Sequence, residues 1–255
     1  LFALVISSMG SAVFQLTAIR LSEMFLGPFR ETFAYVLCVI LLGIAIGALL
    51  VNRFRIGFAA LMIINVIALC LTLAGMGWVI EQFAHYYPLM LDSYWQLVAL
   101  KFACVAVLTL GPAITFGATI PALLNTLNRE GAATIAGDSS AARSPGYLLF
   151  VASFANAGGF LLMSLVLHPR FDYGELLVIV ALLSGLSIVT IGMFSHSAAG
   201  KRWVASLSVM ISLAALVIGS RAMWNEELLY HGYLAFQSKS MMNLKLGKQS
   251  TSERY

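Results

Sequence analysis

Long apolar stretches separated by short polar segments occupy most of the chain. An α-helix of about 20 mainly apolar residues is long enough to cross the ~30 Å hydrocarbon core of a bilayer. The pattern therefore predicts an all-α fold, a polytopic transmembrane helix bundle of about seven spans. The predicted spans are residues 1–19, 32–51, 57–80, 96–124, 146–167, 174–194 and 203–222.

Three polar segments interrupt or follow the apolar stretches. Segment 81–95 is aromatic and mixed in polarity, which is typical of the headgroup level because Tyr and Trp prefer that level. Segment 125–145 is rich in Gly, Ser and Ala and predicts a loop, and Ser144-Pro145 at its end predicts the start of a helix. Residues 223–255 are predicted to form a polar C-terminal tail outside the membrane.

The composition excludes an ordinary soluble domain. Of the 255 residues, 60% are hydrophobic and 10% are charged, whereas soluble domains have about 25% charged residues. The net charge of +4 does not predict a nucleic-acid partner, because the basic residues are spread over loop ends and the tail rather than gathered in one patch. We therefore expect a multi-pass integral membrane protein whose main surroundings are the lipid bilayer.

The residue types of common enzyme and metal sites are present but not clustered. Cys38, Cys70 and Cys104 lie inside apolar runs, and no pair of them has metal or redox spacing. The four histidines lie at or beyond span ends, far apart in sequence. The chain contains no phosphate-binding loop and no nucleophile-elbow motif. The sequence therefore predicts no catalytic residues, no metal site and no cofactor.

Glycines in the second and fifth spans predict close contacts between helices. Gly43 and Gly47 form a GxxxG motif, which lets another backbone approach closely in lipid. Gly158 and Gly159 give the fifth span a similar small-residue surface. The partner is either another helix of this chain or a second membrane protein, which includes a second copy of the chain.

The fourth span contains residues that break helices. Gly111-Pro112 and Gly117 to Pro121 predict an interruption, because each proline lacks an N–H group and clashes with the preceding turn. Broken helices at membrane depth line substrate cavities in transporters. The alternative is a kink whose free carbonyl groups are satisfied by Thr115, Thr119 and neighbouring helices.

Several polar residues lie within the predicted spans and need hydrogen-bond partners in hydrocarbon. They either bond separately between helices or line one shared polar cavity. The members of this candidate cavity are Gln15, Asn65, Thr115, Thr119 and Asn156.

Taken together, these stretches resemble the membrane domain of bacterial membrane-bound spermidine synthase-like proteins, polytopic proteins in which apolar helices precede a cytosolic aminopropyltransferase domain. The resemblance covers roughly residues 1–195 and rests on the order and spacing of short motifs. The matching stretches are Ser11 to Gln15, Ile19-Arg20-Leu21, Leu26-Gly27, Leu41 to Leu50 with Arg53, Gly117 to Pro121, Gly146 to Phe150 and Leu167-His168-Pro169.

The resemblance implies a bacterial inner-membrane location and a link to polyamine chemistry. The family's Asn-Thr-x-Gly-Ala run has lost its Thr here, where Asn156 is followed by Ala157. The Gly-rich donor-binding loop and the catalytic acid of the synthase domain have no counterpart in these residues. We therefore expect a membrane anchor or scaffold that lacks the catalytic domain, within a longer parent that could be an aminopropyltransferase. The alternatives are a small-solute transporter and an accessory subunit of a larger membrane complex.

Overall fold

Helices make up nearly all of the described chain. The computed structural model describes residues 1–27, 30–54, 56–90, 93–133 and 145–194, without the side chains of 127–133 and 192–194. No strand occurs in these ranges. The elements are α1 (Phe2–Leu26), α2 (Arg30–Phe54), α3 (Phe58–Tyr86), the 3-10 helix η1 (Tyr87–Met90), α4 (Tyr94–Gly117), α5 (Thr119–Ala133), α6 (Pro145–Leu162), the π-helix η2 (Met163–Leu167) and α7 (Tyr173–Phe194).

The predicted multi-pass transmembrane helical fold is confirmed. Six helical stretches of the described chain are long and apolar enough to cross a membrane, and they correspond to the first six predicted spans. The predicted seventh span, 203–222, and the predicted tail, 223–255, lie outside the described residues. The six stretches are Phe2–Leu26, Arg30–Phe54, Phe58–Met90, Tyr94–Thr126, Pro145–Leu167 and Tyr173–Ile191.

Several helices extend beyond the apolar runs that predicted them. α1 continues past Arg20 to Leu26, and Arg20 forms a 3.2 Å ion pair with Glu23 one turn later. α5 continues to Ala133, inside the segment predicted as a loop. A helix satisfies its own backbone hydrogen bonds, so polar side chains can continue it into the headgroup region where the apolar pattern stops.

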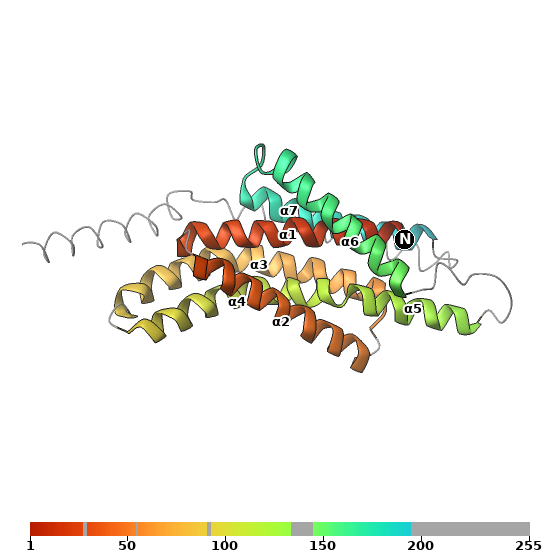
Figure 1. The fold of residues 1–255 in the computed structure, drawn as a ribbon, viewed down its shortest axis with the longest axis horizontal. Coiled ribbons are helices and arrows are strands. Elements are labelled where there is room, and N and C mark those ends of the chain that lie inside the picture. The colour runs from red at the N-terminus through yellow and green to blue at the C-terminus, as the bar shows by residue number, and fades with distance from the viewer. Residues whose placement is uncertain (28–29, 55, 91–92, 134–144, 195–255) are drawn as a thin grey trace, which may run out of the picture.

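The first helix lies at the centre of the bundle. α1 contacts α6 and α7 most extensively, and it also contacts α2 and α4. α4 packs most extensively against α2 and also against α3, and α3 packs against α7. Figure 1 shows α1 in the middle of the bundle, with α6 crossing it and α2 and α4 below it in this view. Helices distant in sequence therefore meet around α1.

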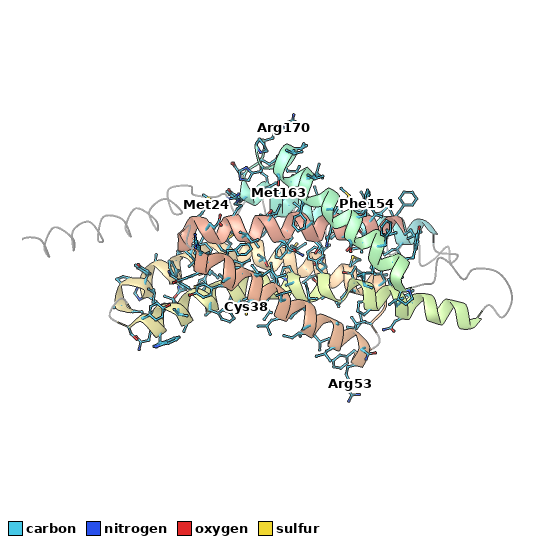
Figure 2. All side chains as sticks on the ribbon, in the orientation of Figure 1. Met24, Cys38, Arg53, Phe154, Met163 and Arg170 are labelled. Atoms are coloured by element: carbon cyan, nitrogen blue, oxygen red, sulfur yellow. The ribbon has the colours of Figure 1, made fainter. Side chains whose placement is uncertain are left out.

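Apolar side chains cover the outside of the bundle as well as filling its core. Met163 is 1% exposed and lies inside, whereas Phe154 is 76% exposed and Cys38 is also exposed on the surface (Figure 2). Arg53 and Arg170, at the ends of helices, point away from the bundle. An apolar outer surface with charges near the helix ends fits lipid surroundings.

The C-terminal end of α1 depends on a glycine. Gly27 has φ 96° and ψ 154°, a backbone region that is essentially restricted to glycine. The hydroxyl group of Thr32 donates a 3.0 Å hydrogen bond to the carbonyl oxygen of Gly27. This bond ties the end of α1 to the first part of α2.

Candidate functional site

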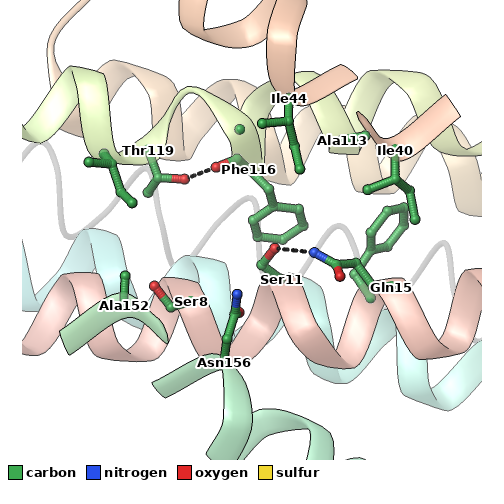
Figure 3. Close-up of a pocket in the computed structure, with 13 residues that line it drawn as sticks. Ser8, Ser11, Gln15, Ile40, Ile44, Ala113, Phe116, Thr119, Ala152 and Asn156 are labelled. Atoms are coloured by element: carbon green, nitrogen blue, oxygen red, sulfur yellow. Dashed lines mark hydrogen bonds between the residues drawn. The ribbon is translucent and has the colours of Figure 1, made fainter. Parts of the chain in front are cut away.

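A pocket with a partly polar lining lies between α1, α2, α6 and the junction of α4 with α5. Its volume is about 160 Å³, and it is partly open to the surface of the described chain. The polar side chains around it come from α1, α5 and α6, as Figure 3 shows. They are Ser8, Ser11, Gln15, Thr119 and Asn156.

The spacing of residues on α1 produces one polar wall of the pocket. Ser8, Ser11 and Gln15 are three and four residues apart, so they share one face of the helix. The Gln15 Nε2 atom donates a 3.3 Å hydrogen bond to Ser11 Oγ. This bond holds the two side chains along the pocket and leaves the Gln15 amide oxygen available as an acceptor.

Asn156 lines the pocket from α6 and lies on the same side as Ser8 and Ser11 (Figure 3). Its neighbour one turn earlier, Ala152, also lines the pocket, and the small alanine leaves room beside the amide. The Asn156 Oδ1 atom is buried and has no hydrogen-bond partner among the described residues. A buried acceptor without a partner costs roughly 1–3 kcal/mol. The lining of the pocket therefore includes an amide whose oxygen lacks a hydrogen-bond donor.

The pocket lining carries no ionisable side chain. The remaining walls are apolar, and the rings of Phe14 and Phe116 lie with their centroids 5.7 Å apart. Thr119 donates its hydroxyl hydrogen to the carbonyl oxygen of Phe116. The described residues also hold no group of three or more His, Cys, Asp or Glu side chains that could bind a metal ion. The chemistry that this arrangement supports is neutral hydrogen bonding.

The structure divides the predicted polar cavity into two groups. Gln15, Thr119 and Asn156 line the pocket, whereas Asn65 and Thr115 do not. Asn65 is fully buried, donates from Nδ2 to Ser184 Oγ at 2.9 Å and accepts from Thr115 Oγ1 at 2.6 Å. These bonds join α3, α7 and α4 and occupy both side-chain atoms of the amide.

The interruption near the fourth span is shorter than predicted. Gly111 and Pro112 lie inside α4, and only Ala118 separates α4 from α5. The Ala118 N–H donates to the Ile114 carbonyl oxygen at 3.1 Å, so hydrogen bonding is almost continuous. Pro121 lies in the first turn of α5, where backbone N–H groups have no helical partner and a proline is tolerated.

A neighbouring helix satisfies the carbonyl group that Pro112 leaves free. A proline at position 112 cannot donate to the carbonyl oxygen of Leu108, four residues earlier. The Thr72 hydroxyl on α3 donates to this oxygen at 3.0 Å. The proline therefore stays within a helix because α3 supplies the missing donor.

Most of the predicted packing glycines lie at close helix contacts. A Cβ atom added to Gly43 would lie 2.5 Å from the Cβ atom of Ala113 on α4. Added Cβ atoms at Gly47 and Gly117 would collide with Ile114 and Ile44 respectively, so α2 and α4 meet through glycines from both sides. An added Cβ at Gly159 would lie 2.7 Å from the Met9 carbonyl oxygen on α1. Gly158 has no such neighbour within 4 Å in the described chain.

Ser8, Ser11 and Ser184 were not among the candidate residues of the sequence. For Ser8 and Ser11 a signal existed, because they share a helical face with Gln15. Ser184 gave no comparable signal, since its role depends on α7 meeting α3.

Comparison with known proteins adds no relative: no family model, no curated protein and no solved structure matches the chain.

Proposed function

We propose that this bundle is the membrane anchor and scaffold of a spermidine synthase-like protein of the bacterial inner membrane. One observation supports the proposal most directly: residues of the resembling motifs make close helix contacts. Gly43 and Gly47 meet α4, and Gly117 meets α2. Small residues at such contacts hold helices together in lipid. These motif residues therefore hold helices together in this chain, which is the role that a scaffold requires.

On this proposal, aminopropyl transfer belongs to a soluble domain of a longer polypeptide. The bundle attaches that domain to the membrane and fixes its position. The pocket between α1 and α6 would be a separate binding feature of the scaffold.

The experiment is the intact mass of the polypeptide as its native cells make it, measured by denaturing mass spectrometry. We expect a mass that exceeds 27.5 kDa, the mass of these residues, by a whole domain. Membranes that contain the protein should then transfer an aminopropyl group to a polyamine acceptor. A native mass near 27.5 kDa would contradict the proposal.

A second candidate function, small-solute transport, is favoured by the polar pocket halfway along the spanning helices. Transport would require water-soluble molecules to reach Gln15 and Asn156 from both sides of the membrane. Proteoliposomes loaded with a neutral solute such as glycerol test this directly. Transport predicts faster glycerol efflux than from glycerol-loaded liposomes without protein, and Asn156→Leu should reduce this efflux. Equal efflux from loaded protein-free liposomes would exclude glycerol-type transport.

A further inference from the structure

We propose that the pocket binds the uncharged head of a molecule dissolved in the bilayer, which enters sideways between α2 and α6. This inference concerns the pocket alone and does not depend on the anchor role or on a soluble domain.

The helices around the pocket leave a lateral opening. α2 packs on α4 and α6 packs on α1, but α2 and α6 share no extensive contact in the described chain. Ile40 and Ile44 border the pocket from α2, and Ala152 and Asn156 border it from α6. Because the pocket is partly open and is lined from both helices, we infer that it meets the surface between α2 and α6.

This opening faces hydrocarbon rather than water. Asn156 lies near the middle of the spanning stretch Pro145–Leu167, and Ser11 and Gln15 lie near the middle of Phe2–Leu26. The outer faces of both helices carry exposed apolar side chains: Leu41 on α2 is 57% exposed, and Phe150 on α6 is 66% exposed. A molecule that reaches the opening sideways must therefore already be dissolved in lipid.

The pocket lining selects a neutral head that donates a hydrogen bond. No ionisable residue lines the pocket, so a charged head would lose its hydration without gaining a counter-charge. Asn156 Oδ1 is a buried acceptor without a partner, and a hydroxyl or amide N–H of the ligand would satisfy it.

The size of the pocket limits how much of the ligand enters it. The volume of about 160 Å³ compares with cavities of roughly 150 Å³ that hold one benzene-sized molecule. The rings of Phe14 and Phe116 offer aromatic surface to such a group. We therefore infer a ring-sized head in the pocket, with an apolar tail that remains in the lipid between α2 and α6.

Photo-crosslinking in phosphatidylcholine vesicles tests the proposal with three matched probes. The first is a long-chain alkylphenol that carries a diazirine, the second lacks the hydroxyl group, and the third carries a quaternary ammonium head. We expect the phenol to label peptides of α1 and α6 most strongly. Glycerol in the aqueous phase should not suppress this labelling.

Two pairs of variants separate the pocket from the general lipid-facing surface. Asn156→Leu removes the acceptor, and its control Ser153→Leu changes an exposed residue of the same helix. Loss of one buried hydrogen bond predicts roughly tenfold weaker phenol labelling for Asn156→Leu. Ile44→Trp fills the opening and should abolish labelling, whereas its control Leu42→Trp changes an exposed residue of α2 outside the pocket and should not.

The helical content of each variant, measured by circular dichroism, is compared with that of the native protein before labelling is interpreted. Equal phenol labelling in Asn156→Leu, in Ile44→Trp and in their controls would overturn the proposal. Equal labelling by the probe without a hydroxyl, or stronger labelling by the ammonium probe, would also overturn it. Suppression by glycerol would assign the pocket to a water-soluble solute instead.

Discussion

Asn65 joins three helices through the two polar atoms of one side chain. Its donor bonds Ser184 on α7, and its acceptor receives the hydroxyl group of Thr115 on α4. The Thr115 hydroxyl also lies 2.8 Å from the carbonyl oxygen of Pro112, so it retains a local partner when Asn65 is removed. The cost of losing Asn65 is therefore set by the bonds between helices alone.

Asn65→Leu should lower the free energy of unfolding by about 1 kcal/mol, because each hydrogen bond between membrane helices contributes roughly 0.6 kcal/mol. Reversible unfolding in mixed detergent measures this change. Asn52→Leu is the control, because Asn52 is exposed near the end of α2. Equal destabilisation by the two substitutions would show that the buried bonds do not contribute.

Thr72 and Pro112 should be energetically coupled through the carbonyl group of Leu108. Thr72→Val leaves this buried oxygen without its donor and should cost roughly 1–3 kcal/mol. Pro112→Ala restores a backbone N–H that can bond the same oxygen. In the Pro112→Ala background, Thr72→Val should therefore cost less, by at least about 0.5 kcal/mol in a double-mutant cycle of unfolding free energies. Additive losses would mean that Thr72 does not compensate for the proline.

At the scale of elements, the close contact between α2 and α4 depends on glycines, which have no side chain to separate the two backbones. Gly47→Ala would place a methyl group against the Ile114 backbone, and the forced separation should cost roughly 1–3 kcal/mol of unfolding free energy. Gly75→Ala on α3 is the matched control, because nothing lies within 4 Å of its added Cβ atom. That control should be neutral, or stabilising by up to ~1 kcal/mol through helix propensity. A larger loss of unfolding free energy for Gly75→Ala than for Gly47→Ala would contradict a tight contact at Gly47.

The connection between α1 and α2 makes a similar demand on backbone conformation. Gly27→Ala should destabilise the protein by roughly 1–3 kcal/mol, because the φ of 96° is strained for any residue with a Cβ atom. Gly57→Ala provides the comparison: Gly57 has φ −76° and ψ 154°, with open space around it. Thermal unfolding of the purified variants should show a lower midpoint for Gly27→Ala only. A similar midpoint for the two variants would show that the backbone at Gly27 accepts a Cβ atom without loss of stability.

The described spans could be predicted from the sequence, because an apolar run of about 20 residues indicates a transmembrane helix. Helix ends were less predictable: α3 continues to Tyr86 because the apolar pattern ends before the helical hydrogen bonds do. The candidate site was only partly predictable. Asn65 and Asn156 carry the same amide, yet one is tied to Ser184 and the other faces the pocket. Whether such an amide bonds another helix or lines a pocket depends on which helix packs against its face. The hydrophobic pattern of a single sequence does not show which helices pack together.

At the scale of the whole molecule, α3 and α4 form a hairpin that extends beyond the ends of α1 and α2 (Figure 1). The stretch Phe58–Met90 has 33 residues, or about 50 Å of helix, which exceeds the ~30 Å hydrocarbon core. Tyr94 and Trp95, close to the tip, are 60% and 77% exposed. The predicted interfacial character of segment 81–95 agrees with this geometry.

Trp95 should therefore lie at the headgroup level, and Trp78 deeper in the membrane. Variants that keep one of these tryptophans allow fluorescence quenching by lipids brominated at different depths. We expect shallow bromines to quench Trp95 best, and deep bromines to quench Trp78 best, because Trp78 lies about 12 Å further from the tip than Tyr86 does. Quenching of both residues at one depth would contradict this placement of the hairpin.

The central position of α1 has a consequence for biosynthesis. A ribosome delivers α1 to the membrane long before α6 and α7, the two helices that pack most extensively against it. Of the six spanning stretches, α1 has the lowest mean hydropathy. During synthesis the polar side chains of α1 therefore stay exposed to lipid or to the insertion machinery until α6 and α7 are inserted. These side chains include Ser7, Ser8 and Gln15. Substitutions in α6 and α7 will therefore lower the yield of correctly inserted protein even where the finished bundle tolerates them, because these later helices complete the environment of α1.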